Sequence, residues 1–127
     1  MPTSSRTTLG LALFVLLAVL DISWLFQVWA GVVDSADAPP TVALVLFALV
    51  GAVTLATAQP ARRGNRAAAW TMSGSRVVSI LLADLPAIFL DAPAWIVAVA
   101  SVAIALSLLG LWWTAPLLGR APAARAA

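Results

Sequence analysis

The sequence predicts an all-α, polytopic membrane protein whose four transmembrane helices form an up-and-down bundle. Hydrophobic residues make up 63% of its 127 residues and charged residues only 9%, whereas a soluble domain is about 45–50% apolar and about 25% charged. The apolar residues fall into four long stretches, and most of the charged residues lie outside them, in the connections and the tails. This composition excludes a soluble globule, and such high hydrophobicity also excludes a disordered chain.

Each stretch has the length that a bilayer demands, which is roughly 20 residues for a hydrocarbon core about 30 Å thick. The predicted helices cover residues 9–33, 41–58, 67–90 and 94–118. The second and fourth contain no charged residue, whereas the first and third do. Because the connections are short, we expect residues 1–127 to form a single transmembrane domain.

Turn-forming residues separate the predicted helices. The first connection, 34–40, contains aspartates and ends in two prolines, and the second, 60–66, begins at a proline and is rich in arginine. The third, 91–93, is tight, and Asp91 is expected to cap the fourth helix. Pro86 lies inside the third helix and is expected to kink it, because proline removes one backbone hydrogen bond.

The first stretch is expected to be a retained helix rather than a cleaved signal peptide. The apolar core of a signal peptide is about 7–15 residues long, and this stretch is longer. The segment Val28-Trp29-Ala30 is also a poor match to the small-x-small pattern of a cleavage site.

The absence of cysteine and histidine limits the chemistry available to the chain. It excludes a disulfide framework, a thiolate zinc site, a cysteine nucleophile and a serine–histidine triad, and we expect neither a metal nor a cofactor. The pI of about 11.2 reflects seven arginines against five aspartates. The arginines are too dispersed to form a basic face, so no nucleic-acid partner is expected. The preference for arginine over lysine, with abundant alanine, valine and leucine, suggests a bacterial origin.

The charges of the connections predict the orientation in the membrane. Arginine occurs in both tails and in the second connection, whereas the first and third connections carry only aspartate. With four crossings, all arginine-bearing segments lie on one side, and the positive-inside rule places both termini in the cytoplasm. We therefore expect a multi-pass protein of the cytoplasmic membrane. Its expected partners are the lipid bilayer and, as an open alternative, a second copy or another membrane protein.

Ionisable side chains inside a membrane are costly, so they face the bundle interior and have partners. At 1.5 Å per residue, Asp21 lies about 18 Å from the inner edge and Arg76 about 14 Å. Because these depths differ by about one helical turn, we expect an ion pair between the first and third helices. Asp84, about 26 Å from that edge, lies nearer the outer surface.

The predicted intramembrane polar site has five members: Asp21, Arg76, Asp84, Gln27 and Ser73. At 100° per residue, Ser73, Arg76, Ile80 and Asp84 share one face of the third helix, and Gln27 continues a polar track on another side of the first helix from Asp21. One arginine cannot neutralise two carboxylates, so the other carboxyl is expected to be protonated or hydrated. Asp21 and Asp84 are therefore the candidate catalytic acids, unless the charges serve only to fix helix packing.

Small residues at four-residue spacing are typical of close helix packing in membranes. On the second helix Ala48, Ala52 and Ala56 form such a stripe, and Ala94 and Ala98 begin one on the fourth. We expect these stripes to serve packing within the bundle or a homodimer.

Three functions remain open from the sequence. The first is an accessory or assembly subunit that binds other membrane proteins, which the short loops and missing catalytic residues favour. The second is an oligomeric transporter or channel subunit that uses the intramembrane Asp and Arg. The third is a membrane-embedded enzyme, such as a cyclase or isomerase, with an Asp general acid for a lipophilic substrate. The enzyme requires a cavity that reaches Asp21 or Asp84, the transporter requires a polar route open to one side, and the accessory subunit requires neither.

Overall fold

The computed structural model describes residues 5–34, 36, 39–90 and 92–119, and within them the chain is helical and has no strand. Four helical segments are long and apolar enough to cross a membrane. Three of them are the single helices α1 (Ser5–Trp29), α2 (Thr41–Arg62) and α5 (Ala94–Leu118). The remaining segment, Arg66–Phe89, consists of α3 (Arg66–Ser79), the π-helical turn η1 (Ile80–Asp84) and α4 (Leu85–Phe89). The predicted all-α, four-span fold is confirmed.

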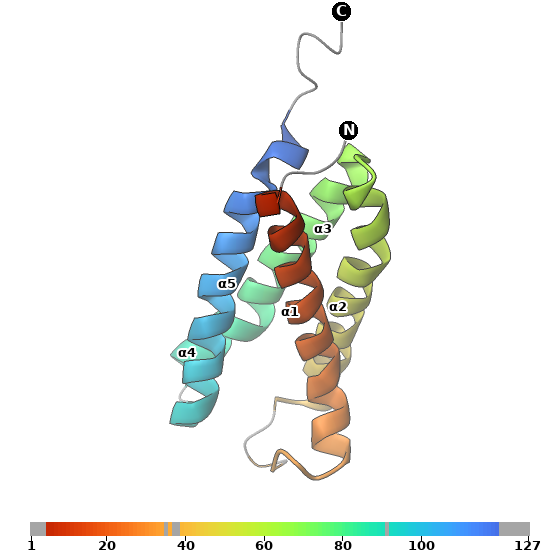
Figure 1. The fold of residues 1–127 in the computed structure, drawn as a ribbon. Coiled ribbons are helices and arrows are strands. Elements are labelled where there is room, and N and C mark those ends of the chain that lie inside the picture. Colours follow the sequence, from red (N-terminus) through yellow and green to blue (C-terminus); the bar gives the residue numbers. More distant parts are fainter. Residues whose placement is uncertain (1–4, 35, 37–38, 91, 120–127) are drawn as a thin grey trace, which may run out of the picture.

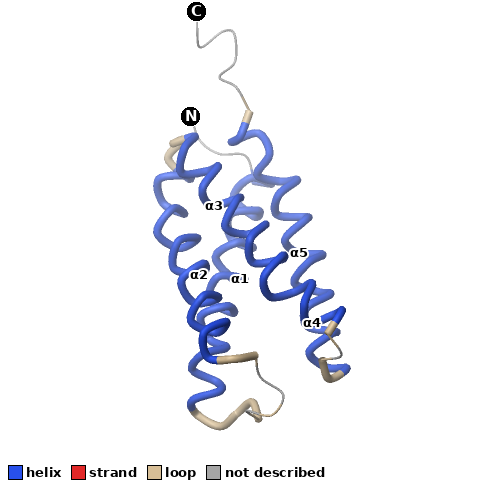
Figure 2. Tube along the Cα trace, turned by 180° about the vertical axis from the view of Figure 1, so that it is seen from behind, coloured by secondary structure: helices blue, strands red, loops and turns tan. Residues whose placement is uncertain are grey.

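The four segments run alternately up and down and form a closed bundle (Figure 1). α1 packs against α2 and α5, and α3 packs against the same two helices from the other side. The start of α1, the α2–α3 turn and the end of α5 therefore lie at one end of the bundle, which we call the arginine end. The α1–α2 and α4–α5 connections lie at the opposite end (Figure 2), which we call the loop end.

α1 begins and ends four residues earlier than predicted, at Ser5 and Trp29 rather than at residues 9 and 33. Gly31 explains where the helix ends, because its φ of 77° belongs to the left-handed region that glycine adopts without strain. The N–H of Val32 donates to the carbonyl oxygen of Gln27 at 2.9 Å, and the N–H of Gly31 donates to that of Val28 at 3.2 Å. These two bonds form a Schellman motif, which closes the helix before its apolar sequence ends.

α2 continues to Arg62, beyond the predicted end at residue 58. Pro60 lies in its last turn and does not stop it, and the chain leaves the helix at Gly64, whose φ is 93°. The N–H of Asn65 donates to the carbonyl oxygen of Pro60 at 3.0 Å, as in the turn after α1. Asn65 also begins α3, because its side-chain oxygen accepts a 3.1 Å bond from the N–H of Ala68.

The third span differs from a regular α-helix where Pro86 was expected to kink it. Over Ile80–Asp84 the backbone takes one wider, π-helical turn, and the N–H of Leu85 donates to the carbonyl oxygen of Ile80, five residues earlier. Proline has no N–H to donate and its ring clashes with the carbonyl four residues before it. A π-turn just before Pro86 absorbs one extra residue and so accommodates the missing hydrogen bond.

α5 begins and ends at the predicted residues, 94 and 118. Asp91, the expected cap of this helix, lies outside the described residues.

The bundle core consists of two apolar clusters separated by a polar layer. One cluster, at the arginine end, is built around Phe14 and Met72. The other, toward the loop end, is formed by Leu25, Leu44 and Phe47. The buried polar residues between them are Asp21, Thr54, Ser75, Arg76 and Ser79.

The closest helix approaches use glycine rather than the predicted alanine stripes. A methyl group at Gly51 on α2 would lie 2.7 Å from the carbonyl oxygen of Ala18 on α1, and one at Gly110 on α5 would lie 2.6 Å from the ring of Phe14. Of the predicted alanine stripe on α2, Ala48 packs against the Leu25 cluster, whereas Ala52 and Ala56 face outward. At Gly51 the backbones of α1 and α2 approach too closely for a side chain, and at Gly110 the ring of Phe14 takes the space that a side chain would need.

Candidate functional site

The centre of the polar layer is an ion pair between α1 and α3. The Nη2 of Arg76 donates to the Oδ2 of Asp21 at 2.8 Å, as the similar depths of the two residues predicted. Only 1% of Arg76 is exposed, so the guanidinium lies in a low-dielectric interior where a charge-assisted hydrogen bond is strong.

Hydroxyl groups form hydrogen bonds with both members of this ion pair. The Oγ of Ser79 donates to the same Asp21 oxygen at 2.9 Å, and the Nε of Arg76 donates to the Oγ1 of Thr54 at 3.1 Å. Ser75 in turn forms a hydrogen bond with the hydroxyl of Thr54. No buried side-chain nitrogen or oxygen of the described chain lacks a partner, so the layer meets the requirement for polar groups in lipid.

Thr54, Ser75 and Ser79 are members of the site that the sequence prediction missed. Ser79 lies three residues after Arg76, a spacing at which helix side chains are neighbours, and Ser75 directly precedes Arg76. A search for hydroxyl residues flanking an intramembrane charge finds these two. Thr54 lies on α2, which carries no charge in its span, so the sequence offers no reason to connect it with Arg76.

Two predicted members of the site lie apart from the ion pair. Gln27 donates from its Nε2 to the Oγ of Ser23 at 2.9 Å, within α1, and it faces away from Asp21 because six residues turn an α-helix by about 600°. Ser73 is buried but contributes no hydrogen bond to the pair within the described chain. Ile80, which was expected on the same face, is only half-buried, and Ser79 takes the inward position.

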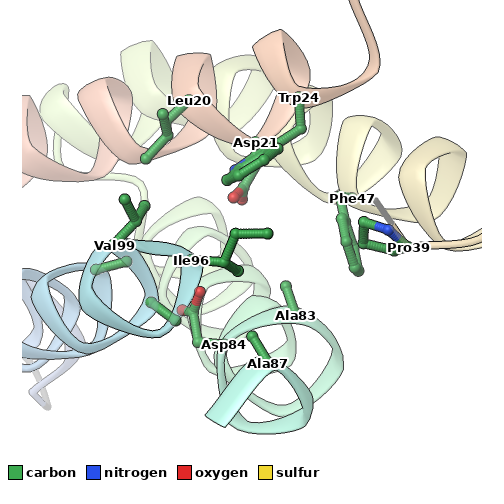
Figure 3. Close-up of a pocket in the computed structure, with 12 residues that line it drawn as sticks. Leu20, Asp21, Trp24, Pro39, Phe47, Ala83, Asp84, Ala87, Ile96 and Val99 are labelled. Atoms are coloured by element: carbon green, nitrogen blue, oxygen red, sulfur yellow. The ribbon is translucent and has the colours of Figure 1, made fainter. Parts of the chain in front are cut away.

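A small cavity lies on the loop side of the ion pair. Its volume is about 50 Å³, and both Asp21 and Asp84 line it (Figure 3). One bound water occupies at least about 10–15 Å³ by this measure, so the cavity accepts a few waters or a small solute. The other walls are apolar or aromatic, including Trp24, Phe47 and Ile96.

Asp84 and Asp21 reach this cavity from opposite walls and point toward one another (Figure 3). The π-turn accounts for the direction of Asp84. In a continuous α-helix, Asp84 would be rotated by about 80° from Arg76, because eight residues turn a helix by about 800°. One residue absorbed by the wider turn reduces this difference to about 20°, which brings Asp84 to the face that carries Arg76.

The Asp84 carboxyl has no hydrogen bond or ion pair with any described residue. Among the described residues the salt bridge is the Asp21–Arg76 pair. The carboxyl oxygens of Asp84 accept no hydrogen bond from any of these residues. Asp84 is half-buried. Its carboxyl is thus available to whatever enters the cavity.

A second, larger cavity continues from the first toward the loop end. Its volume is about 340 Å³, and Phe47, Ala83 and Ile96 line both cavities. Its outer walls include Ala36, Pro40 and Pro93 from the connections. The side chains that line this outer cavity are apolar, and backbone atoms supply its polar surface. The two cavities together lead from the loop end to a carboxyl group.

The chemical groups at this site allow a carboxyl to hold a proton or a small cation. Two carboxyls face one guanidinium, and Asp21 already pairs with that guanidinium. In the described chain no group of three acidic, histidine or cysteine residues is placed to bind a metal ion.

A comparison with protein-family models, curated proteins and solved structures finds no match to this chain.

Proposed function

We propose that this multi-pass membrane protein is a carrier that exchanges protons for a small cation at Asp84. The observation that supports this proposal is the carboxyl of Asp84, which has no partner among the described residues and lines a cavity continuous with the loop end. A carrier needs such a binding site in the membrane interior, reached from one side at a time.

The balance of charge favours a cationic ligand. The spans contain Asp21, Asp84 and Arg76 and no other ionisable residue in their apolar interior. The ion pair neutralises one carboxylate, so the other must hold a proton or another cation to avoid an unpaired charge in lipid. A proton and a cation that compete for one carboxyl satisfy the basic requirement of exchange.

The charge of the connections at the loop end supports the same ligand. The two connections at the loop end contain Asp34, Asp37 and Asp91 and no arginine. Negative charge at the entrance of a low-dielectric cleft raises the local concentration of cations. With the arginine end in the cytoplasm, this entrance faces the outside of the cell.

The opposite route is closed by tight packing. Phe14 and Met72 are fully buried between the ion pair and the arginine end, and the close contact of Gly110 with Phe14 leaves no space there. The cavity therefore corresponds to the outward-open state of the proposed carrier. The π-turn and Pro86, next to Asp84, provide an irregular segment where the third span can bend.

The test is cation-driven proton flux in proteoliposomes. The purified protein is reconstituted with an internal pH-sensitive dye, and gradients of Na⁺, K⁺ or tetramethylammonium are applied in turn. At least one cation should drive proton movement above the level of protein-free liposomes. Asp84→Asn should abolish this flux, because the amide neither binds a proton nor balances a cation.

Asp34→Asn is the matched control. Asp34 lies in the α1–α2 connection, where its carboxylate accepts a hydrogen bond from the N–H of Ala36 at 2.9 Å, a bond that asparagine retains. This variant removes one entrance charge but no cation-binding group, so it should lower the flux only slightly, whereas Asp84→Asn should abolish it. If the folded wild-type protein moves no protons with any of the three cations, the carrier proposal is wrong and the accessory role becomes the better explanation.

One observation favours a second candidate, a membrane-embedded enzyme. The outer cavity of about 340 Å³ approaches the size of a small-ligand pocket, about 300–1,000 Å³, and its apolar walls suit a lipophilic substrate with Asp84 as general acid. The enzyme predicts conversion of a substrate without cation flux. An accessory or assembly role needs no cavity, so the cavities give it no support.

A further inference from the structure

A separate groove lies between α1 and α2 at the arginine end. Its volume is about 260 Å³, and it lies far along both helices from the Asp84 cavity. Seven residues line it: Thr8, Leu11, Ala12, Val15, Ala58, Gln59 and Arg62. The groove plays no part in the proposed carrier site.

The lining of this groove changes from polar to apolar with depth. Thr8 and Arg62 lie near the ends of the antiparallel helices α1 and α2, where the charged and polar ends of transmembrane helices meet the lipid headgroups. Ala12 and Ala58 lie about one turn deeper, and Val15 lies about 10 Å below Thr8 at 1.5 Å per residue. This gradient matches a phospholipid, whose charged headgroup lies at the interface and whose acyl chains extend into the membrane.

Arg62 has no acidic partner at this end. The five aspartates of the sequence are at positions 21, 34, 37, 84 and 91, whereas the arginine end carries Arg6, Arg62, Arg63 and Arg66. Arg66 donates from its Nε to the carbonyl oxygen of Leu118 at 3.2 Å, while Arg62 is exposed at the rim of the groove.

From these observations we infer that the α1–α2 groove binds one anionic phospholipid, with its phosphate at Arg62 and an acyl chain along Ala12, Ala58 and Val15. Thr8 and Gln59 supply neutral hydrogen-bond donors beside the phosphate. Basic pockets between transmembrane helices commonly bind acidic headgroups in this way. The small side chains of Ala12 and Ala58 leave the width that an acyl chain fills.

A second copy of this chain is a poorer occupant. In a parallel dimer its arginine end would meet this arginine end, and no aspartate lies near enough in the sequence to balance Arg62. Like charges would then repel across the interface. A lipid phosphate supplies the missing negative charge without this cost.

The test measures lipid retention by native mass spectrometry. The delipidated protein, in a mild neutral detergent, is incubated with equal amounts of phosphatidylglycerol and phosphatidylcholine. An arginine at the interface favours an anionic lipid by about fivefold, so the wild-type protein should retain one phosphatidylglycerol about fivefold over phosphatidylcholine. Arg62→Gln should reduce the ratio to near one.

Arg63→Gln is the matched control, because it removes the same charge from the next residue, which does not line the groove. It should keep the preference. Ala12→Phe leaves every charge in place and fills the groove from its exposed wall, so it should lower retention of both lipids. Equal losses in Arg62→Gln and Arg63→Gln, or full retention in Ala12→Phe, would show that lipid binds the arginine end diffusely and would overturn the inference.

Discussion

Asp21 and Arg76 stabilise one another because neither is tolerated alone in the interior of the bundle. The Asp21 Oδ2 accepts hydrogen bonds from both Arg76 and Ser79, and Thr54 accepts one from Arg76. Removing one member of a buried ion pair leaves the other charge uncompensated, which typically costs about 3–5 kcal/mol. Replacing both charges with apolar groups of similar volume often costs little.

A double-mutant cycle tests this account of the pair. Arg76→Met and Asp21→Leu should each lower the free energy of unfolding by about 3–5 kcal/mol. The combined variant should be more stable than either single variant, because no unpaired charge remains. The measurement is unfolding in detergent followed by circular dichroism. Losses that simply add in the double variant would argue against coupling between the two residues.

The third span differs from the others because it both crosses the membrane and carries two ionisable residues, Arg76 and Asp84. Its π-turn brings Asp84 close to the helix face of Arg76, and Pro86 follows the turn by two residues. π-turns inside α-helices occur frequently at functional sites. The irregularity therefore coincides with a residue that lines the cavity, Asp84.

Pro86→Ala should restore a regular α-helix and rotate residue 84 by about 100° away from the cavity. The chain has no cysteine, so an Asp84→Cys variant carries a single thiol. A water-soluble maleimide added from the loop end should label this thiol more slowly in the Pro86→Ala background. Ala36→Cys, in the α1–α2 connection, serves as the control and should react equally in both backgrounds. Unchanged labelling of position 84 would mean that Pro86 does not maintain the turn.

At the scale of the whole molecule, the alternation of the spans places the start of α1 and the end of α5 at the same end of the bundle (Figure 1). The arginine end carries Arg6, Arg62, Arg63 and Arg66, and the loop end carries only aspartates. This asymmetry sets the orientation that we expect, with the arginine end in the cytoplasm. The proposed cavity entrance and the proposed lipid groove then face opposite sides of the membrane.

Single-cysteine labelling of intact cells tests this orientation. An impermeant thiol reagent should label Ala36→Cys at the loop end without further treatment. Arg63→Cys at the arginine end should react only after the membrane is permeabilised. The reverse labelling pattern would show that the protein has the opposite orientation, with the cavity entrance on the cytoplasmic side.

Much of the candidate site followed from the sequence, but not all of it. The pairing of Asp21 with Arg76 was predictable because depth along a helix is proportional to residue number, and the high cost of a charge in lipid leaves few partners. Thr54 was not predictable, because nothing in α2 marks one threonine among its polar residues. Gln27 was placed in the predicted site on polarity alone, yet its amide bonds to Ser23 within its own helix.

The sequence by itself determined the number of spans, their alternating direction and the asymmetry of charge, since these depend on hydropathy and on the positions of arginine and aspartate along the chain. Only the tertiary structure decided that glycines rather than alanines form the closest contacts and that a π-turn directs Asp84 toward Asp21. It also decided that a cavity lies between these carboxyls. The physical reason is that hydropathy is a property of each segment, whereas a cavity and its lining depend on how four helices are rotated against one another.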